Sequence, residues 1–311
     1  MIDITFSPEV ADARAKGAPL VALESTIITH GMPWPQNVST ARAVENAVRA
    51  HGATPATIAV LNGKLHVGLT DPELDALGQA KDVAKLSRAD FAACLATGGT
   101  GATTVAATMI AAHLAGIEVF ATGGIGGVHR GAETSFDISA DLAELAQTPV
   151  TVVAAGAKAI LDLPKTLEVL ETSGVPVIAY GQDAFPAFWS RDSGLAAPLR
   201  MDRPEEIARA ARMRAAMGLP GGQLVANPIP EADEIAADTL APVIAAALAE
   251  AERQGIAAKA VTPFLLDHIF HATGGASLTA NIALVENNAR LAARIAKAVV
   301  TLARGGENTD G

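Results

Sequence analysis

The sequence is poor in cysteine and in aromatic residues. Of its 311 residues one is a cysteine, Cys94, and phenylalanine, tryptophan and tyrosine together make up 4%. A single cysteine excludes a disulfide framework within the chain and suits a cytosolic protein, because disulfides are rare where thiols are kept reduced. With so few aromatic residues, alanine and the branched aliphatic residues must fill the core, which favours closely packed helices on a sheet.

Basic residues are outnumbered as well. The chain has 23 Lys and Arg against 33 Asp and Glu, a formal net charge of −10. Such an acidic chain repels polyanions, so we expect no nucleic-acid polymer as a partner, although a local cationic pocket can still bind one small phosphate. Hydrophobic residues make up 50% and charged residues 18%, which supports a large core and argues against disorder.

The sequence shows neither a targeting segment nor a long uninterrupted apolar run. Its N-terminus carries Asp3 and Glu9 and no basic cluster, unlike a signal peptide. The most apolar stretch, Thr103–Thr122, is interrupted by His113 and Glu118. This stretch divides into a helix and a strand, so we expect no membrane span. We therefore expect a cytoplasmic protein.

Short apolar runs alternate with helical patterns along the chain. The predicted strands are Leu20–Leu23, Ala56–Leu61, Lys64–Leu69, Ile117–Ala121, Val150–Ala155, Val175–Tyr180 and Gln223–Ala226. The predicted helices are Pro35–Ala50, Ser87–Ala93, Ala102–Leu114, Ser139–Ala146, Ala159–Thr172, Pro204–Met217, Glu231–Gln254, Pro263–His271 and Leu278–Arg304. This alternation predicts an α/β fold, an αβα sandwich with a mainly parallel central sheet.

Two further features concern the organisation of the chain. Asn62-Gly63 lies between two of the predicted strands, and this dipeptide favours a two-residue hairpin turn. We find no internal repeat, and no linker long or polar enough to mark a boundary. We therefore expect residues 1–311 to form a single domain.

Ligands of open α/β sheets bind beyond the carboxyl ends of strands, so residues there are the first candidates. Glu24 follows the strand Leu20–Leu23. Such a carboxylate can act as a general acid when burial favours its protonated form, or it can cap a helix or pair with a lysine. Lys158 follows the strand Val150–Ala155. A lysine that loses hydration there is partly neutral and forms imines with carbonyl carbons, unless its ammonium reaches solvent.

A glycine-rich segment, Thr122–Gly131, follows the predicted strand Ile117–Ala121. Glycines let backbone N–H groups approach an anion closely, and His129 and Arg130 add charge, although a flexible turn has the same composition. Counted from Gly124, the position of the last glycine in the dinucleotide fingerprint holds His129. A nucleotide cofactor is therefore not expected.

Oxygen-bearing side chains follow this segment. Asp137, Ser139 and Asp141 can hold a hard divalent cation that keeps several waters, or Ser139 and Asp141 can simply cap a helix. Trp34 and Trp189 can line a base pocket or fill surface grooves. These alternatives stay open on the residues alone.

Several long motifs resemble one known family. They are Ala22–Pro33, Asn62–Gly68, Gly101–Ala106, Val119–Gly131, Phe136–Leu142, Ala155–Lys158, Ala226–Pro230 and Thr262–Leu266. They resemble the pseudouridine-5′-phosphate glycosidases, also called the indigoidine synthase A-like family, and the match runs from about Val21 to about Ile295. One departure is Ala258, where the family usually has glycine; we expect it to alter a turn and not the chemistry.

The resemblance implies an αβα core, a homotrimer and a manganese ion, Mn²⁺. It places Glu24 as proton donor, Lys158 as nucleophile and Asp137 as metal ligand. It also implies substrate contacts at Lys85, Val105, Ser139, Ala140 and Asp141, and contacts around the sugar phosphate at Thr122, His129 and Asn281.

The implied activity is the reversible cleavage of the carbon–carbon glycosidic bond of pseudouridine 5′-phosphate to uracil and ribose 5-phosphate. The expected route is a covalent lysine adduct with ring-opened ribose. The nearest alternative is a related C-nucleoside or sugar-phosphate lyase of pigment biosynthesis, and a second is a silent phosphosugar-binding protein. Some members of the family carry a fused sugar-kinase domain, which we do not expect here.

Overall fold

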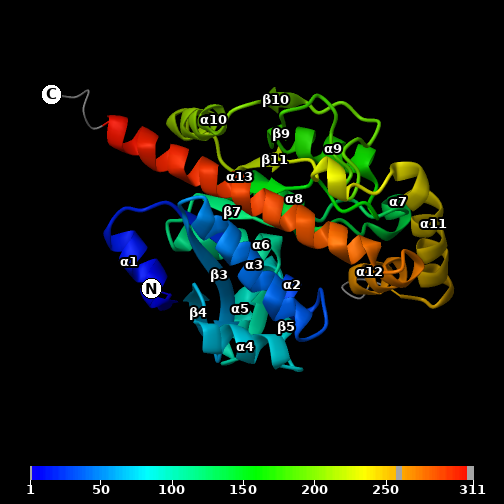
Figure 1. Ribbon diagram of the computed structural model, residues 1–311, viewed down its shortest axis with the longest axis horizontal. Helices are drawn as coiled ribbons and strands as arrows, with labels where there is room; N and C mark the ends of the chain where they lie inside the picture. The colour runs from blue at the N-terminus through cyan, green and yellow to red at the C-terminus, as the bar shows by residue number, and fades with distance from the viewer. Residues whose placement is uncertain (1, 257–260, 307–311) are drawn as a thin grey trace.

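The computed structural model describes residues 2–256 and 261–306 (Figure 1). The departure expected at Ala258 lies outside these residues. The strands of the described chain are β1 (Ile4–Phe6), β2 (Leu20–Leu23), β3 (Thr54–Leu61), β4 (Lys64–Val67), β5 (Ala84–Leu86), β6 (Gly101–Thr103), β7 (Val119–Ala121), β8 (Thr151–Ala154), β9 (Val177–Tyr180), β10 (Leu199–Met201) and β11 (Gln223–Ala226).

Helices connect and cover these strands. They are α1 (Pro8–Ala15), α2 (Thr26–Thr29), α3 (Gln36–Ala50), α4 (Asp71–Gln79), α5 (Arg88–Ala96), α6 (Val105–Leu114), α7 (Ala132–Ser135), α8 (Ala140–Gln147), α9 (Leu163–Thr172), α10 (Pro204–Ala216), α11 (Ala237–Arg253), α12 (Val261–Ala272) and α13 (Ala276–Gly306), with a 3₁₀ turn, η1 (Glu231–Asp233). None of the helices in the described ranges is long and apolar enough to cross a membrane.

One sheet of mainly parallel strands runs through the molecule. Its main path has the order β1-β4-β3-β2-β7-β8-β11-β9-β10; β6 also pairs with β3, and β5 pairs with β6. Along the stretch β2-β7-β8-β11-β9-β10 all neighbouring strands pair in parallel. β3, by contrast, pairs antiparallel with β4 and β6. The central strands β7, β8 and β11 are buried throughout and rich in valine and alanine, as expected of strands covered on both faces. The predicted α/β fold with a mainly parallel sheet is confirmed.

The long helix α13 crosses the sheet beside α3, and both lie over the same face in Figure 1. It packs on β2, β7 and β8 and also contacts α10. Small buried residues along it, including Ala289, Ala292 and Ala293, allow the helix to approach the strands closely. The alanine-rich composition thus serves helix-to-sheet packing, as the shortage of aromatic residues predicted.

The hairpin prediction at Asn62-Gly63 is confirmed. Asn62 and Gly63 have φ angles of 50° and 74°, and Leu61 pairs with Lys64 across the turn. Two successive positive φ angles suit asparagine and glycine and match the twist of the flanking strands.

Three helices begin at least three residues later than predicted. Residues predicted to open the helix Ala102–Leu114 form β6, because the Thr103 side chain donates to the Ile58 carbonyl at 2.9 Å and holds this segment against β3. The helix predicted from Ala159 begins at Leu163, where Asp162 caps it. The helix predicted from Glu231 begins at Ala237, after the short turn η1. The sequence analysis also missed β1, β5, β10, α1, α2, α4 and α7.

Candidate active site

Three adjacent parallel strands bring the main candidates together. In the register of the sheet Leu23 pairs with Ala121, and Ala121 pairs with Val153. Glu24 leaves β2, the glycine-rich loop leaves β7, and the segment ending in Lys158 leaves β8. Side chains far apart in the sequence therefore meet at the carboxyl edge of one sheet.

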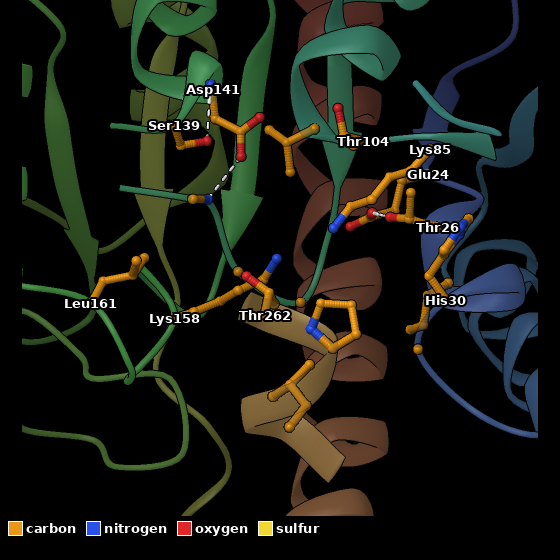
Figure 2. A pocket seen from close by; sticks show the side chains of 18 of the residues that line it. Glu24, Thr26, His30, Lys85, Thr104, Ser139, Asp141, Lys158, Leu161 and Thr262 are labelled. Atoms are coloured by element: carbon orange, nitrogen blue, oxygen red, sulfur yellow. Dashed lines mark hydrogen bonds between the residues drawn. The ribbon is translucent and has the colours of Figure 1, made fainter. Parts of the chain in front are cut away.

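A cavity of about 380 Å³ lies at this edge. The predicted site residues that line it are Glu24, Lys85, Val105, His129, Asp137, Ser139, Ala140, Asp141, Lys158 and Asn281. Figure 2 shows Lys158 on one side of this space and Glu24, Thr26 and Lys85 on the other. Their chemical roles remain predictions.

Two threonine hydroxyls hold the Glu24 carboxylate. Thr26 donates to one oxygen and Thr122 to the other, so both oxygens accept a hydrogen bond. Thr122 is 1% exposed and is not among the residues that line the cavity. Its hydroxyl is thus turned to Glu24, a contact that the sequence analysis did not foresee.

The N-termini of α6 and α8 meet at the cavity. Val105 opens α6, Ala140 opens α8, and both line the cavity together with Lys85. Helix N-termini present backbone N–H groups and a partial positive charge, so this end favours an anion. Val105 and Ala140 have no polar side chain, but their position at the helix N-termini lets their backbone contribute to anion binding.

Asp141 joins these two helices to the glycine-rich loop. Its carboxylate accepts hydrogen bonds from the backbone N–H groups of Ala106, at 3.0 Å, and Gly126, at 2.8 Å. A side chain at Gly126 would begin only 2.2 Å from the Ser139 hydroxyl. The loop needs glycine here so that its backbone can approach α8 this closely.

Thr104 is a further polar residue of this end. It lines the cavity, and its Oγ1 has no hydrogen-bond partner within the described ranges although the atom is buried. Such a group calls for a partner supplied by a ligand or by water. The sequence analysis missed it, although its place directly before the N-terminus of α6 was a usable signal.

Two histidines, His30 and His129, line the cavity together with Lys85 and Lys158. Burial lowers the pKa of His129; the Asp137 carboxylate opposes this shift, and Lys158 and Lys85 add to it. Burial also lowers the pKa of His30, and Lys85 lowers it further. Both shifts favour the neutral imidazole.

A tight backbone arrangement positions Lys158. The Lys158 N–H donates to the Ile125 carbonyl at 3.1 Å, and the Ile125 N–H donates to the Gly156 carbonyl at 3.1 Å. Gly156 has a φ of +83°, and a side chain there would begin 2.4 Å from the Pro186 carbonyl oxygen. Glycine is thus required two residues before Lys158, and the lysine leaves β8 on a fixed loop.

The remaining wall of the cavity is mostly apolar. Phe188, Leu266, Leu284 and Val285 line it, and Asn281 adds an amide. Leu266 ends the motif Thr262–Leu266, whereas Phe188, Leu284 and Val285 belong to no motif that the sequence analysis singled out. The cavity thus has an anion-binding end, at the N-termini of α6 and α8, and an apolar wall, and it places Glu24 and Lys158 on opposite sides.

The carboxylates of the cavity suit a metal ion that keeps most of its water ligands better than one bound mainly by protein side chains. No group of three His, Cys, Asp or Glu side chains with metal-binding geometry occurs in the parts of the chain that the structure describes. Asp137 lines the cavity, and both oxygens of Asp141 already accept backbone hydrogen bonds. A hard divalent cation bound through one carboxylate and several waters is compatible with this set.

Comparison with known families identifies relatives over nearly the whole chain. The family model described as indigoidine synthase A like protein matches residues 9–298. A protein of Jannaschia sp. (strain CCS1), named pseudouridine-5′-phosphate glycosidase, is 74% identical over 300 residues, which cover 96% of this chain and 99% of the relative. A protein of the same name from Roseobacter denitrificans is 71% identical, over 97% of this chain and 98% of the relative.

Solved structures show the same fold. The prealnumycin C-glycosynthase AlnA, in complex with ribulose 5-phosphate, matches with a TM-score of 0.90 and 42% identity, over 97% of this chain and 98% of that chain. An indigoidine synthase A-like protein from Thermotoga maritima matches with a TM-score of 0.87 and 34% identity, over 97% of both chains.

Proposed function

The chain belongs to the indigoidine synthase A like protein family, and on that premise we propose that it is a pseudouridine-5′-phosphate glycosidase. It cleaves the carbon–carbon bond between uracil and ribose 5-phosphate, reversibly. The observation that carries the proposal is one cavity that holds Glu24 and Lys158 together with an anion-binding end and an apolar wall. Relatives at 71% and 74% identity carry the name of this activity.

The anion-binding end of the cavity suits the phosphate of the substrate, and the apolar wall suits its base. The phosphate is bound at the N-termini of α6 and α8 with Lys85, where backbone N–H groups and an ammonium favour an anion. The flat base lies against the apolar wall around Phe188 and Leu284. Binding at both ends fixes the reacting bond near Lys158 and Glu24 and supplies orientation.

Lys158 is the nucleophile in this proposal. A carbon–carbon glycosidic bond has no leaving nitrogen or oxygen to protonate, so the usual pair of glycosidase carboxylates does not suffice. The Lys158 nitrogen attacks C1′, the bond from C1′ to the ring oxygen breaks, and an open-chain adduct forms. Uracil then leaves with the bonding electrons while the nitrogen lone pair makes an imine with C1′. Water hydrolyses the imine and releases ribose 5-phosphate.

Glu24 delivers the proton that uracil C5 must gain as the bond breaks. The hydroxyls of Thr26 and Thr122 hold its carboxyl group in one place. A proton donor has to reach the accepting atom within hydrogen-bond distance, so a fixed orientation contributes directly to rate.

We also propose that Asp137 holds Mn²⁺ with a largely hydrated shell. When bound, the ion supplies positive charge that orients oxygen ligands. His129 lies against Asp137, since its backbone N–H donates to the Asp137 carbonyl at 3.0 Å, and its side chain lines the cavity beside Asp137. The proposed assembly is a homotrimer, as the family resemblance implies.

Chemical trapping tests the nucleophile. Wild-type protein incubated with ribose 5-phosphate and borohydride should gain the mass of a reduced sugar-phosphate adduct, and peptide mapping should place it on Lys158. Lys158→Ala should show no gain and no turnover while still binding substrate. Lys85→Ala is the matched control, because it removes another lysine of the same cavity and should still be trapped at high sugar phosphate. An adduct retained in Lys158→Ala would exclude this nucleophile.

The nearest rival is a related C-nucleoside or sugar-phosphate lyase. The solved C-glycosynthase that matches at 42% identity is named for the formation of such a bond and is bound to ribulose 5-phosphate. A panel of C-nucleotides and pentose phosphates separates the two activities. The glycosidase proposal predicts that pseudouridine 5′-phosphate gives the highest kcat/KM of the panel.

A further inference from the structure

Trp189 fixes the orientation of the Asn281 side chain. Trp189 is 1% exposed, and its indole N–H contacts Oδ1 of Asn281 at 2.7 Å. An indole N–H can only donate a hydrogen bond, so the amide atom that it meets must be the oxygen. This contact removes the usual ambiguity between the oxygen and the nitrogen of an amide.

The amide nitrogen of Asn281 is consequently the atom left for the cavity. Asn281 lines the cavity among Phe188, Leu266, Leu284 and Val285. Within the described residues we find no hydrogen bond from its Nδ2 to another group. A donor in a mostly apolar wall is satisfied when a ligand places an acceptor oxygen against it.

The turn that carries Trp189 is held on several sides. Within Ala187–Ser190 the Ala187 N–H donates to the Ser190 carbonyl at 2.9 Å, and the Phe188 N–H donates to the Ala155 carbonyl at 3.0 Å. The Ile235 N–H donates to the Trp189 carbonyl at 2.9 Å. Phe188 adopts a φ of +63°, which a residue with a side chain rarely does, so these contacts maintain a strained backbone. Trp189 thus stands on a rigid support.

An inverted amide would be unfavourable. It would set the NH₂ group of Asn281 against the buried indole N–H of Trp189, two donors facing each other. The indole N–H would lose its acceptor although Trp189 is 1% exposed, and an unsatisfied buried donor costs more than an ordinary hydrogen bond contributes. The orientation is therefore a property of the protein and not of the ligand.

We propose that Trp189 is a positioning residue that turns the Asn281 amide so that its NH₂ group recognises a carbonyl oxygen of the base, which selects a uracil-type base over one with an amino group at that place. The inference rests on the proposed glycosidase activity and specifies how its base is chosen. It assigns Asn281 to the base, whereas the family resemblance implies a contact around the sugar phosphate. A site built to donate to an oxygen rejects an amino group strongly, because two donors then face each other.

The test compares two kinds of substrate in one protein. kcat and KM are measured for pseudouridine 5′-phosphate and for its analogues in which either ring carbonyl is replaced by an amino group. Trp189→Phe keeps an aromatic ring and removes the donor. We expect its KM for pseudouridine 5′-phosphate to rise about tenfold with a smaller change in kcat. Its preference for the carbonyl base over one of the analogues should fall by about tenfold.

Ser190→Ala is the matched control. It removes a hydrogen bond of the same turn, from the Ser190 hydroxyl to the Ile235 carbonyl at 2.6 Å, without touching Asn281. A merely structural defect lowers kcat/KM for all substrates together and leaves the preference unchanged. A preference that stays constant in Trp189→Phe, or falls equally in Ser190→Ala, would overturn the inference.

Asn281→Asp gives a second route if Trp189→Phe fails to fold. The indole N–H then meets one carboxylate oxygen, and the other oxygen faces the cavity as an acceptor. The preference should shift toward an amino analogue, and an unshifted preference would again overturn the inference. Wild-type protein that releases no uracil would refute the proposed activity as well, whereas normal release with unshifted preferences would refute only the role of Trp189.

Discussion

At the scale of single residues, the hydroxyl groups behind Glu24 are the least expected part of the site. Thr122 was predicted to lie around the sugar phosphate, yet its buried hydroxyl donates to Glu24. The two roles differ in kinetics. A residue that positions the proton donor affects kcat, whereas a phosphate contact made equally in the ground state and the transition state affects KM.

Thr122→Val should therefore lower kcat about tenfold or more with little change in KM, because Glu24 loses one of the donors that fix it. Thr122→Ser keeps the hydroxyl and should retain most activity. Steady-state kinetics on pseudouridine 5′-phosphate measure both. A raised KM with unchanged kcat would favour the phosphate contact instead.

Glu24→Gln tests the proton donor itself. The amide has nearly the shape of the carboxyl group but carries no transferable acidic proton. We expect kcat to fall by at least about a hundredfold, the range of general acid–base catalysis, while substrate still binds. Near-normal turnover in this variant would exclude Glu24 from the proposed role.

At the scale of helices and strands, an ion pair between a half-exposed arginine and a buried glutamate links two elements of the site. Arg88, at the start of α5, donates to the Glu144 carboxylate of α8 at 2.5 Å, and the Glu144 side chain is fully buried. Thr148 donates to its other oxygen. α5 follows the strand that carries Lys85, and α8 follows Ser139, so the pair holds together the two walls of the anion-binding end.

Arg88→Met should lower the free energy of unfolding by about 1–2 kcal/mol, less than for a fully buried pair, because the buried Glu144 carboxylate loses its charged partner but keeps the hydrogen bond from Thr148. Arg88→Met combined with Glu144→Gln removes the unpaired charge and should recover part of that loss. Urea unfolding of the wild type and of these two variants measures the effect. Equal stability of Arg88→Met and the wild type would show that the pair contributes nothing.

The N-terminus of α4 gives a prediction about pH. Thr70 and Glu73 form a capping box, in which the Thr70 N–H and hydroxyl both donate to Glu73 at 2.8 Å. Partial burial raises the pKa of Glu73, but the bonds from Thr70 and the neighbouring His66 outweigh it and hold the pKa below its usual value of 4.5. The stabilisation is thus present above that value and lost as the pH falls through the lowered pKa.

Glu73→Ala should cost about 1 kcal/mol at pH 7, the usual contribution of a helix cap. The difference from wild type should narrow in acid, once Glu73 is protonated in the folded protein. Thermal unfolding at several pH values measures it. A difference that stays constant down to about pH 3, below the ordinary carboxyl pKa, would contradict the assignment.

Some strands could be predicted from the sequence and others could not. β2 and β11 have the predicted bounds, because short apolar runs ended by polar residues leave little choice. β6 was missed because Gly101–Thr103 continues into an apolar helix, and only its pairing with β3 and β5 makes it a strand. The apolar cavity wall shows the same limit, since Phe188 enters it through a turn held by Ala155 and Ile235, distant in the sequence.

At the scale of the whole molecule, the proposed assembly is a homotrimer. Phe136 is 81% exposed and Trp34 is 57% exposed, and a subunit interface can cover large apolar side chains of this kind. Light scattering on the purified protein should give three times the mass of the chain. A monomer mass at micromolar concentration would contradict the trimer.

The most direct test of the central claim is the release of uracil from pure pseudouridine 5′-phosphate, followed by chromatography with Mn²⁺ and with EDTA. Our account predicts release with Mn²⁺, equimolar ribose 5-phosphate, and loss of both products when EDTA removes the metal. Release that persists in EDTA would remove the metal from the account and leave the reaction standing. Folded protein that releases no uracil in either condition would contradict the proposed function.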